Sequence, residues 1–320
     1  MRTIEAPSLD AIRAARSRIA GSAIRTPLVR LGVSDAPAEI WLKLECLQPI
    51  GSFKLRGAGN AMALLPPETL AQGVYTASAG NMAQGVAWNA RRLGVPCTVI
   101  VPDHAPQTKI AAVERLGASI VRLPFDAWWN VLVEHHHPGI DGVFVHPVSD
   151  PAVIAGNGTI GLEILEDLPD VRAVVVPFGG GGLSCGIGSA IRALSPGVKI
   201  LAAEVATAAP LAASLAAGAL RKVDYTPSFV DGIGSTGVLE EMWPLASSLL
   251  DGSCVVSVAE AAAAIKLLVE RNRVVAEGAG AASVAAAHSG KAGGGKVVCV
   301  VSGGNIDAGK LAAILSGEIP

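Results

Sequence analysis

Lys54 lies between two apolar residues, Phe53 and Leu55, in the segment GSFKLRG (residues 51–57). Apolar neighbours leave an ammonium group poorly hydrated, and poor hydration favours the neutral amine. A neutral lysine amine is the nucleophile that a Schiff base requires. The same residues also fit a lysine that begins a helix and extends its ammonium into solvent. On these residues alone, both interpretations stay open.

Four consecutive glycines, Gly179, Gly180, Gly181 and Gly182, precede Leu183 at the junction of an apolar strand pattern and a helical pattern. Glycines let successive N–H groups turn toward one anion, and the start of a helix adds its positive dipole end. The spacing is neither the GxGxxG of dinucleotide sites nor a P-loop, which ends in Lys-Ser/Thr. A tight turn without a ligand needs fewer glycines. We therefore predict a phosphate site here.

A second turn of this kind consists of Ser78, Ala79, Gly80, Asn81 and Met82. It offers backbone amides, a hydroxyl and a carboxamide, which suffice to hold a carboxylate. By itself the turn could equally be a helix cap. A third polar turn, SGGN, begins at Ser302 after the most apolar strand pattern of the chain.

These turns follow strand patterns and precede helix patterns. Apolar runs predict strands over residues 75–77, 97–101, 120–123, 143–145, 173–176, 199–203 and 296–301. Patterns of helical period cover residues 81–93, 109–116, 183–194 and 257–272. Strands separated by one helix each predict βαβ units and parallel sheets. Because ligands collect at the carboxyl ends of parallel strands, we expect the lysine and the turns to form one site.

Composition excludes several classes of protein. The 320 residues predict about two domains. Lys and Arg number 25 against 27 Asp and Glu, without a basic stripe, so neither nucleic acid nor a membrane is an expected partner. The five cysteines are scattered without metal-binding spacing and are expected to be buried thiols in a reducing compartment. No apolar leader is visible at the N-terminus. We therefore expect a cytoplasmic protein.

Five strings occur in one order between residues 26 and 305: SFKLRGAGNAM, TASAGNMAQGVAWNARRLGV, HPVSDPAVIAGNGTIGLEIL, GGGG and VVSGGN. Together they resemble the fold-type II pyridoxal-phosphate enzymes, in particular the threonine/serine dehydratase (threonine ammonia-lyase) and serine racemase group. The resemblance implies an α/β fold like that of the tryptophan synthase β subunit, with parallel sheets flanked by helices. It also implies a cofactor in the cleft between a large domain (residues 1–70 plus 150–320) and a small inserted domain (residues 71–149), and a homodimer.

The resemblance also implies a role for each matching residue. Lys54 would hold pyridoxal 5′-phosphate covalently beside Phe53, and residues 179–183 would cradle the phosphate. The other implied cofactor contacts are Asn81 toward the ring hydroxyl, Ser302 toward the pyridine nitrogen, and Glu277 near the ring. Residues 78–82 would hold the substrate carboxylate. A serine hydroxyl cannot keep the ring nitrogen protonated as a carboxylate would, which disfavours a long-lived carbanion and suits β-elimination.

The chain departs from the family pattern at several positions. Met82 replaces a histidine found in many relatives, which predicts a more apolar and wider substrate pocket. Ala79 stands where serine racemases carry a second acid/base serine. Glu204 matches the first ligand of a family cation site, but Pro210 occupies the second position and cannot ligate, so we expect no metal. The tract of three histidines at residues 135–137 is expected to be a solvated loop.

The expected activity is the dehydration and deamination of a β-hydroxy amino acid to a 2-oxo acid and ammonia. L-Threonine, L-serine and a bulkier analogue are the expected small-molecule substrates. Two alternatives stay open: an amino-acid racemase of the same family, and a catalytically silent homologue that only binds an amino acid. An intact Lys54 and the phosphate turn argue against the silent homologue.

Overall fold

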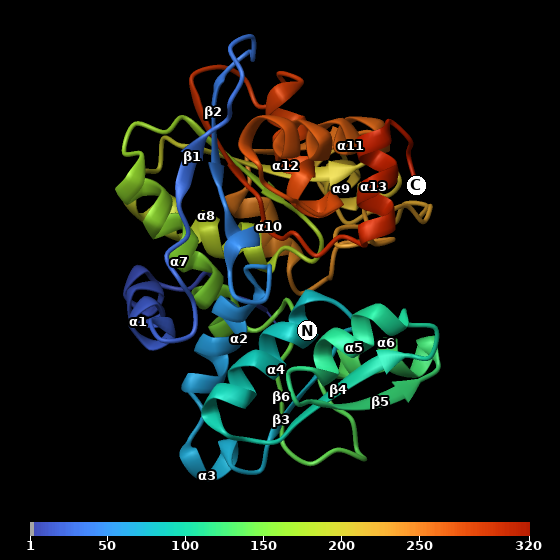
Figure 1. The fold of residues 1–320 in the computed structure, drawn as a ribbon. Helices are drawn as coiled ribbons and strands as arrows, with labels where there is room; N and C mark the ends of the chain where they lie inside the picture. Colours follow the sequence, from blue (N-terminus) through green and yellow to red (C-terminus); the bar gives the residue numbers. More distant parts are fainter. Residues whose placement is uncertain (1–2) are drawn as a thin grey trace.

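The computed structural model describes residues 3–320, which fold around two separate sheets (Figure 1). The larger sheet has six strands in the order β1-β2-β10-β7-β8-β9, and the smaller has four in the order β5-β4-β3-β6. Strand β1 runs antiparallel to β2, and every other neighbouring pair is parallel. The predicted α/β class with parallel sheets is therefore confirmed.

The larger sheet is covered by helices on both faces. Its strands are β1 (Leu28–Arg30), β2 (Glu39–Lys43), β7 (Ala173–Pro177), β8 (Lys199–Val205), β9 (Gly252–Val256) and β10 (Lys296–Val300). Around it lie α1 (Leu9–Ile19), the 3₁₀ turn η1 (Glu45–Leu47), α7 (Pro151–Asp167), α8 (Gly182–Leu194), α9 (Pro210–Ala217), α10 (Trp243–Leu249), α11 (Val258–Leu267), α12 (Gly278–His288) and α13 (Ala308–Ser316).

Neighbouring residues of one strand point to opposite faces, so the strands of the larger sheet contribute side chains to two hydrophobic clusters. Val174 and Val298 pack in the cluster that contains α8 and α10. Val175 and Val297 pack in the cluster that contains α11 and α12. Burial on both faces explains why β7 and β10 read as continuous apolar runs.

The smaller sheet is built from a single stretch of chain. Its strands are β3 (Val74–Ala77), β4 (Cys97–Pro102), β5 (Ser119–Leu123) and β6 (Val143–Phe144), accompanied by α3 (Pro67–Leu70), α4 (Asn81–Leu93), α5 (Gln107–Glu114) and α6 (Phe125–Glu134). Helix α2 (Lys54–Ala63) lies between the two sheets in Figure 1 and packs against both α4 and α7. The expected lysine therefore begins the helix at the junction of the two sheets.

Sequence patterns located most of the elements around the site. The helix expected at residues 81–93 is confirmed as α4, and the strand expected at 296–301 is confirmed as β10 within one residue. The single helix expected at 257–272 is wrong in its second part. Helix α11 ends at Leu267, a π-helical turn (Leu268–Asn272) follows, and Arg273 ends it with a left-handed φ of 59°. Within residues 3–320, no helix is both long and apolar enough to cross a membrane.

Candidate active site

Lys54 is the first residue of α2, and its side chain is only partly exposed. Its Nζ donates a hydrogen bond to the Pro147 carbonyl oxygen at 2.9 Å and lies 5.2 Å from the centre of the Phe53 ring. Burial lowers the pKa of this amine from 10.5 to about 8, an effect that the negative charge of Glu277 partly offsets. Lys54 therefore carries more neutral amine near neutral pH than an exposed lysine does.

The four glycines connect the end of β7 to the start of α8. Gly181 has a φ of +96°, a left-handed conformation that glycine adopts without strain. A Cβ added at Gly180 would come within 2.5 Å of Val148 Cγ2, so the turn lies directly against that residue. Leu183 buries its side chain in the adjoining core. In the described chain, the N–H groups of residues 179–182 donate to no protein acceptor, and such amides at a helix start suit an anion.

The turn between β3 and α4 has the same character. Ser78 Oγ accepts a hydrogen bond from the Gly80 N–H at 3.2 Å, which holds the turn closed. As far as the structure describes the chain, the N–H groups of Ala79, Asn81 and Met82 donate to no protein acceptor. The start of the 13-residue α4 therefore presents several amides that suit a carboxylate.

Met82 contributes little more than its backbone to this turn. Its side chain is only 2% exposed and packs in the core of the smaller sheet, with Ala58 and Val86 in the same cluster. A side chain that is part of this core cannot line a substrate pocket unless the core repacks. The burial therefore argues against Met82 as the wall that widens the pocket.

Asn81 joins the carboxylate turn to the opposite side of the site. Its Nδ2 donates to Glu277 Oε1 at 2.8 Å, and its Oδ1 accepts from Asn305 Nδ2 at 2.8 Å. Asn305 also donates to the Ile50 carbonyl oxygen at 2.9 Å. Asn305 closes the VVSGGN string, but nothing in the sequence indicates that it reaches Asn81. This contact depends on the tertiary fold alone.

Glu277 is the acidic group of the site, and its side chain comes from the residue before α12. Burial raises the pKa of Glu277 from 4.5 to about 7, and the hydrogen bond from Asn81 partly opposes that rise. Glu277 and Lys54 thus form a pair of ionisable groups whose pKa values lie close together. Such perturbed pairs are typical of functional sites.

Ser302 follows β10 and is only 3% exposed. Its carbonyl oxygen accepts from the Phe53 N–H at 3.1 Å, and Gly303 forms an isolated bridge with Ser52. The end of β10 therefore lies beside the residues that precede Lys54. Through these contacts, the structure brings the three turns and the lysine together, as their places at strand ends suggest.

The Glu204 carboxylate accepts hydrogen bonds from other groups of the protein. It accepts from the N–H groups of Leu211 at 2.9 Å and Ala212 at 2.8 Å, and from Ser253 Oγ at 2.6 Å. Pro210 is the first residue of α9. The carboxylate therefore satisfies amides at the start of α9 and is favoured there by the helix dipole. The absence of metal dependence stays a prediction.

The histidine tract differs from its expected form. His135 ends α6 with a left-handed φ of 56° and stacks on His146, with the ring centres 4.1 Å apart and the rings 9° from parallel. His135 Nε2 lies 3.3 Å from Glu241 Oε1. The prediction of a solvated loop is therefore wrong for His135.

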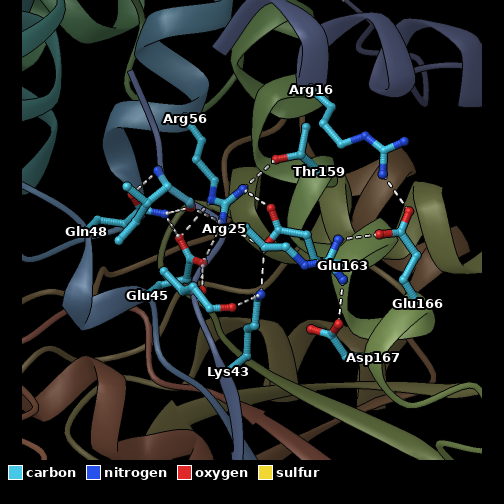
Figure 2. A network of polar contacts seen from close by, with 12 residues as sticks. Arg16, Arg25, Lys43, Glu45, Gln48, Arg56, Thr159, Glu163, Glu166 and Asp167 are labelled. Atoms are coloured by element: carbon cyan, nitrogen blue, oxygen red, sulfur yellow. Dashed lines mark hydrogen bonds and ion pairs between the residues drawn. The ribbon is translucent and has the colours of Figure 1, made fainter. Parts of the chain in front are cut away.

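A buried ionic network supports α2 next to the site, and Figure 2 shows its members. Arg56 Nη2 lies 2.8 Å from Glu45 Oε1, and Arg56 Nη1 lies 2.7 Å from Glu163 Oε1. Lys43 Nζ lies 2.6 Å from Glu163 Oε2. The charge of Arg56 holds the pKa of Glu45 below its usual range although burial raises it. Two cations and two anions thus balance one another close to Lys54.

The residues present fit pyridoxal phosphate. A poorly hydrated lysine amine can react with an aldehyde, and the amides of the glycine turn can hold a phosphate dianion. The turn at residues 78–82 offers a second anion site for a carboxylate. An amino acid and a phosphorylated aldehyde could therefore be held side by side.

Comparison with known proteins also points to pyridoxal phosphate. The family described as "Pyridoxal-phosphate dependent enzyme" matches residues 19–303. An L-threonine ammonia-lyase from Thermotoga maritima is 42% identical over 315 residues, which cover 97% of this chain and 78% of that protein.

Solved structures of related enzymes resemble this chain over nearly its whole length. The structure of maize serine racemase matches with a TM-score of 0.90 and 33% identity, covering 98% of each chain. The processed form of threonine deaminase isoform 2 from Solanum lycopersicum matches with a TM-score of 0.84 and 34% identity, covering 99% of this chain and 92% of that one. The chain belongs to the family of pyridoxal-phosphate dependent enzymes.

Proposed function

We propose that this enzyme is an ammonia-lyase that converts a β-hydroxy amino acid, L-threonine or L-serine, into a 2-oxo acid and ammonia. The observation that carries the proposal is the placement of Lys54. Its amine has a lowered pKa and donates to the Pro147 carbonyl oxygen, in the loop whose Val148 packs against the glycine turn. The names of the similar ammonia-lyase and deaminase support the same reaction.

In this proposal the site binds the cofactor and the substrate through different residues. Lys54 links to the cofactor, with Phe53 beside the link and Ser302 at the end of β10. Residues 179–183 hold the phosphate, and residues 78–82 hold the substrate carboxylate through backbone amides. When bound, pyridoxal phosphate withdraws electrons from the α-carbon of the amino acid and makes its proton acidic.

Lys54 is the base of the reaction. With the cofactor and substrate bound, its neutral Nζ would take the proton from the α-carbon. The hydrogen bond to the Pro147 carbonyl oxygen orients this amine. The bond from the β-carbon to the hydroxyl would then break, and the hydroxyl would leave as water, with the proton that Lys54 took from the α-carbon balancing the one it gains. Hydrolysis of the product releases the 2-oxo acid and ammonia.

Racemisation is the competing activity, and Ala79 argues against it. A racemase needs an acid or base on each face of the α-carbon. Lys54 serves one face, and the methyl group of Ala79 cannot carry a proton. The neighbouring Ser78 Oγ is directed at the Gly80 N–H of its own turn, from which it accepts a hydrogen bond. We therefore expect elimination to dominate.

A panel of β-hydroxy amino acids tests this proposal. With L-threonine and L-serine we expect 2-oxo acid and ammonia in equal amounts, and chiral analysis at partial conversion should find almost no D-isomer in the unreacted pool. Accumulation of D-serine from L-serine would contradict the proposal and favour a racemase. The Ala79→Ser variant is the matched gain-of-function trial, in which some racemisation should appear.

The proposal includes a division of the chain into residues 1–70 plus 150–320 and residues 71–149. All four strands of the smaller sheet come from residues 74–144, which supports this division. It also includes a cytoplasmic location, supported by five free cysteines, four of them buried. A homodimer rests on the family resemblance, and sedimentation velocity measures it.

A further inference from the structure

The loop of residues 146–149 contacts both the Lys54 amine and the glycine turn. It lies at the carboxyl end of β6 and leads into α7. Its Pro147 carbonyl oxygen accepts the hydrogen bond from Lys54 Nζ at 2.9 Å. Its Val148 side chain packs so tightly on Gly180 that a Cβ there would come within 2.5 Å of it. One short loop therefore contacts the reactive amine and the phosphate turn.

His146 organises this loop from within. Its Nδ1 accepts from the N–H groups of Val148 at 3.1 Å and Ser149 at 2.7 Å, and Ser149 Oγ lies 2.9 Å away. The ring is 3% exposed. Because Nδ1 is the acceptor, the neutral ring carries its proton on Nε2. Removing this acceptor would leave two amides to find other partners.

His135 stacks on the His146 ring, and Glu241 lies beside His135. The ring centres are 4.1 Å apart, and His135 Nε2 lies 3.3 Å from Glu241 Oε1. Their side chains are 17% and 20% exposed. The three residues also place nitrogen and oxygen atoms within 4.8 Å of one another. Nearly parallel rings cannot direct their in-plane lone pairs at one ion, so this stack is not a preformed metal centre.

We propose that His146, backed by His135 and Glu241, is a positioning residue that holds the 146–149 loop against Lys54 and the phosphate turn. The inference rests on the proposed function, in which Lys54 moves the proton. His146 itself touches neither Lys54 nor the glycine turn in any of these contacts. It acts through Pro147 and Val148, so its loss should affect proton transfer and cofactor binding more than binding of the substrate carboxylate at residues 78–82.

Three variants separate this role from general stability. His146→Leu removes the acceptor, His146→Asn keeps an acceptor oxygen that can bond the same amides, and the exposed His136→Asn is the control. We expect His146→Leu to lower kcat about tenfold or more with KM changed less than about threefold, and to weaken pyridoxal-phosphate binding. His146→Asn should recover most of both losses, and His136→Asn should match the parent enzyme.

Hydrogen exchange of the cofactor-free protein gives a readout that needs no substrate. In His146→Leu, amides of residues 148 and 149 should exchange faster while those of β4 and β7 keep their protection. This result would stand even if the enzyme deaminated none of the amino acids tested, so the two proposals can fail separately. Unchanged exchange at residues 148 and 149, or faster exchange with unchanged kcat and cofactor affinity, would overturn the inference.

If His146→Leu does not fold, variants of His135 and Glu241 provide the test. Glu241→Gln and His135→Asn alter partly exposed side chains, and we expect both proteins to fold. Each should lower kcat about threefold and raise exchange at residue 149, since both loosen the support of the His146 ring. Normal kcat and normal exchange in both variants would overturn the proposal.

Discussion

Glu277 and Lys54 are half-buried ionisable groups whose charged forms are poorly solvated. The pKa of Glu277 is raised to about 7, so the folded cofactor-free protein is stabilised by its protonated form. This contribution is complete below the unfolded pKa near 4.5 and is lost as the pH rises through 7. Above pH 7, the ionised carboxylate should therefore destabilise the cofactor-free protein.

The Glu277→Gln variant tests this effect because glutamine keeps an oxygen that can accept from Asn81. In the cofactor-free protein, the gain in unfolding free energy from this substitution should be about 2 kcal/mol larger at pH 8 than at pH 5. Urea unfolding at the two pH values measures the difference. The exposed Glu270→Gln should give no such difference, and an equal gain from Glu277→Gln at both pH values would contradict the assigned burial.

The chemistry of single residues was predictable where it depends on sequence neighbours. Phe53 and Leu55 flank Lys54 in the chain, and this local pattern indicated a poorly hydrated amine as one of two readings, the other being a lysine that extends into solvent. The contacts from Pro147 and Asn305 could not be predicted in the same way, because these residues lie far from Lys54 and Asn81 along the chain. Met82 shows the reverse case: its position in the motif indicated a substrate contact, but the amphipathic period of α4 turns its side chain into the core.

The glycine turn depends on close packing between β7, α8 and the 146–149 loop. Gly180→Ala would place a Cβ within 2.5 Å of Val148 Cγ2, so the turn or the loop must move. We expect the affinity for pyridoxal phosphate to fall about tenfold or more, equivalent to ~1.4 kcal/mol. Absorbance titration of the cofactor measures the change.

Two further variants sharpen that measurement. A Cβ at Gly197 would meet no atom within 4 Å, so Gly197→Ala should leave cofactor affinity unchanged. Adding Val148→Ala to Gly180→Ala removes the colliding methyl groups and should restore part of the affinity. Full affinity in Gly180→Ala alone would show that the turn does not hold the phosphate.

Continuous apolar runs in the sequence predicted the strands that are buried on both faces, such as β7 and β10. It missed β2 (Glu39–Lys43), because a strand that begins and ends with a charged residue resembles surface chain. Lys43 is fully buried and is balanced by Glu163 at 2.6 Å, a partner supplied by α7 from far along the sequence. The end of α11 was missed for another reason: its apolar pattern continues through the π-helical turn that precedes Arg273.

The network in Figure 2 joins η1, α2, β2 and α7 around Arg56. Arg56→Met would leave Glu45 and Glu163 with Lys43 as their remaining cation. Because breaking a buried ion pair leaves an uncompensated charge, we expect a loss of about 3–5 kcal/mol in unfolding free energy. Arg16 pairs with Glu166 at the surface, so Arg16→Met should cost less than about 1 kcal/mol. Similar losses in both variants would contradict the network's role.

The proposed function depends on Lys54, which would carry the cofactor and move the proton. Borohydride reduction of the loaded enzyme, followed by peptide mapping, tests it directly. We predict that the reduced cofactor is found on the peptide containing Lys54, and that Lys54→Ala loses both this adduct and all release of 2-oxo acid from L-threonine. Recovery of the adduct on another lysine, such as Lys109, or turnover by Lys54→Ala, would contradict the claim.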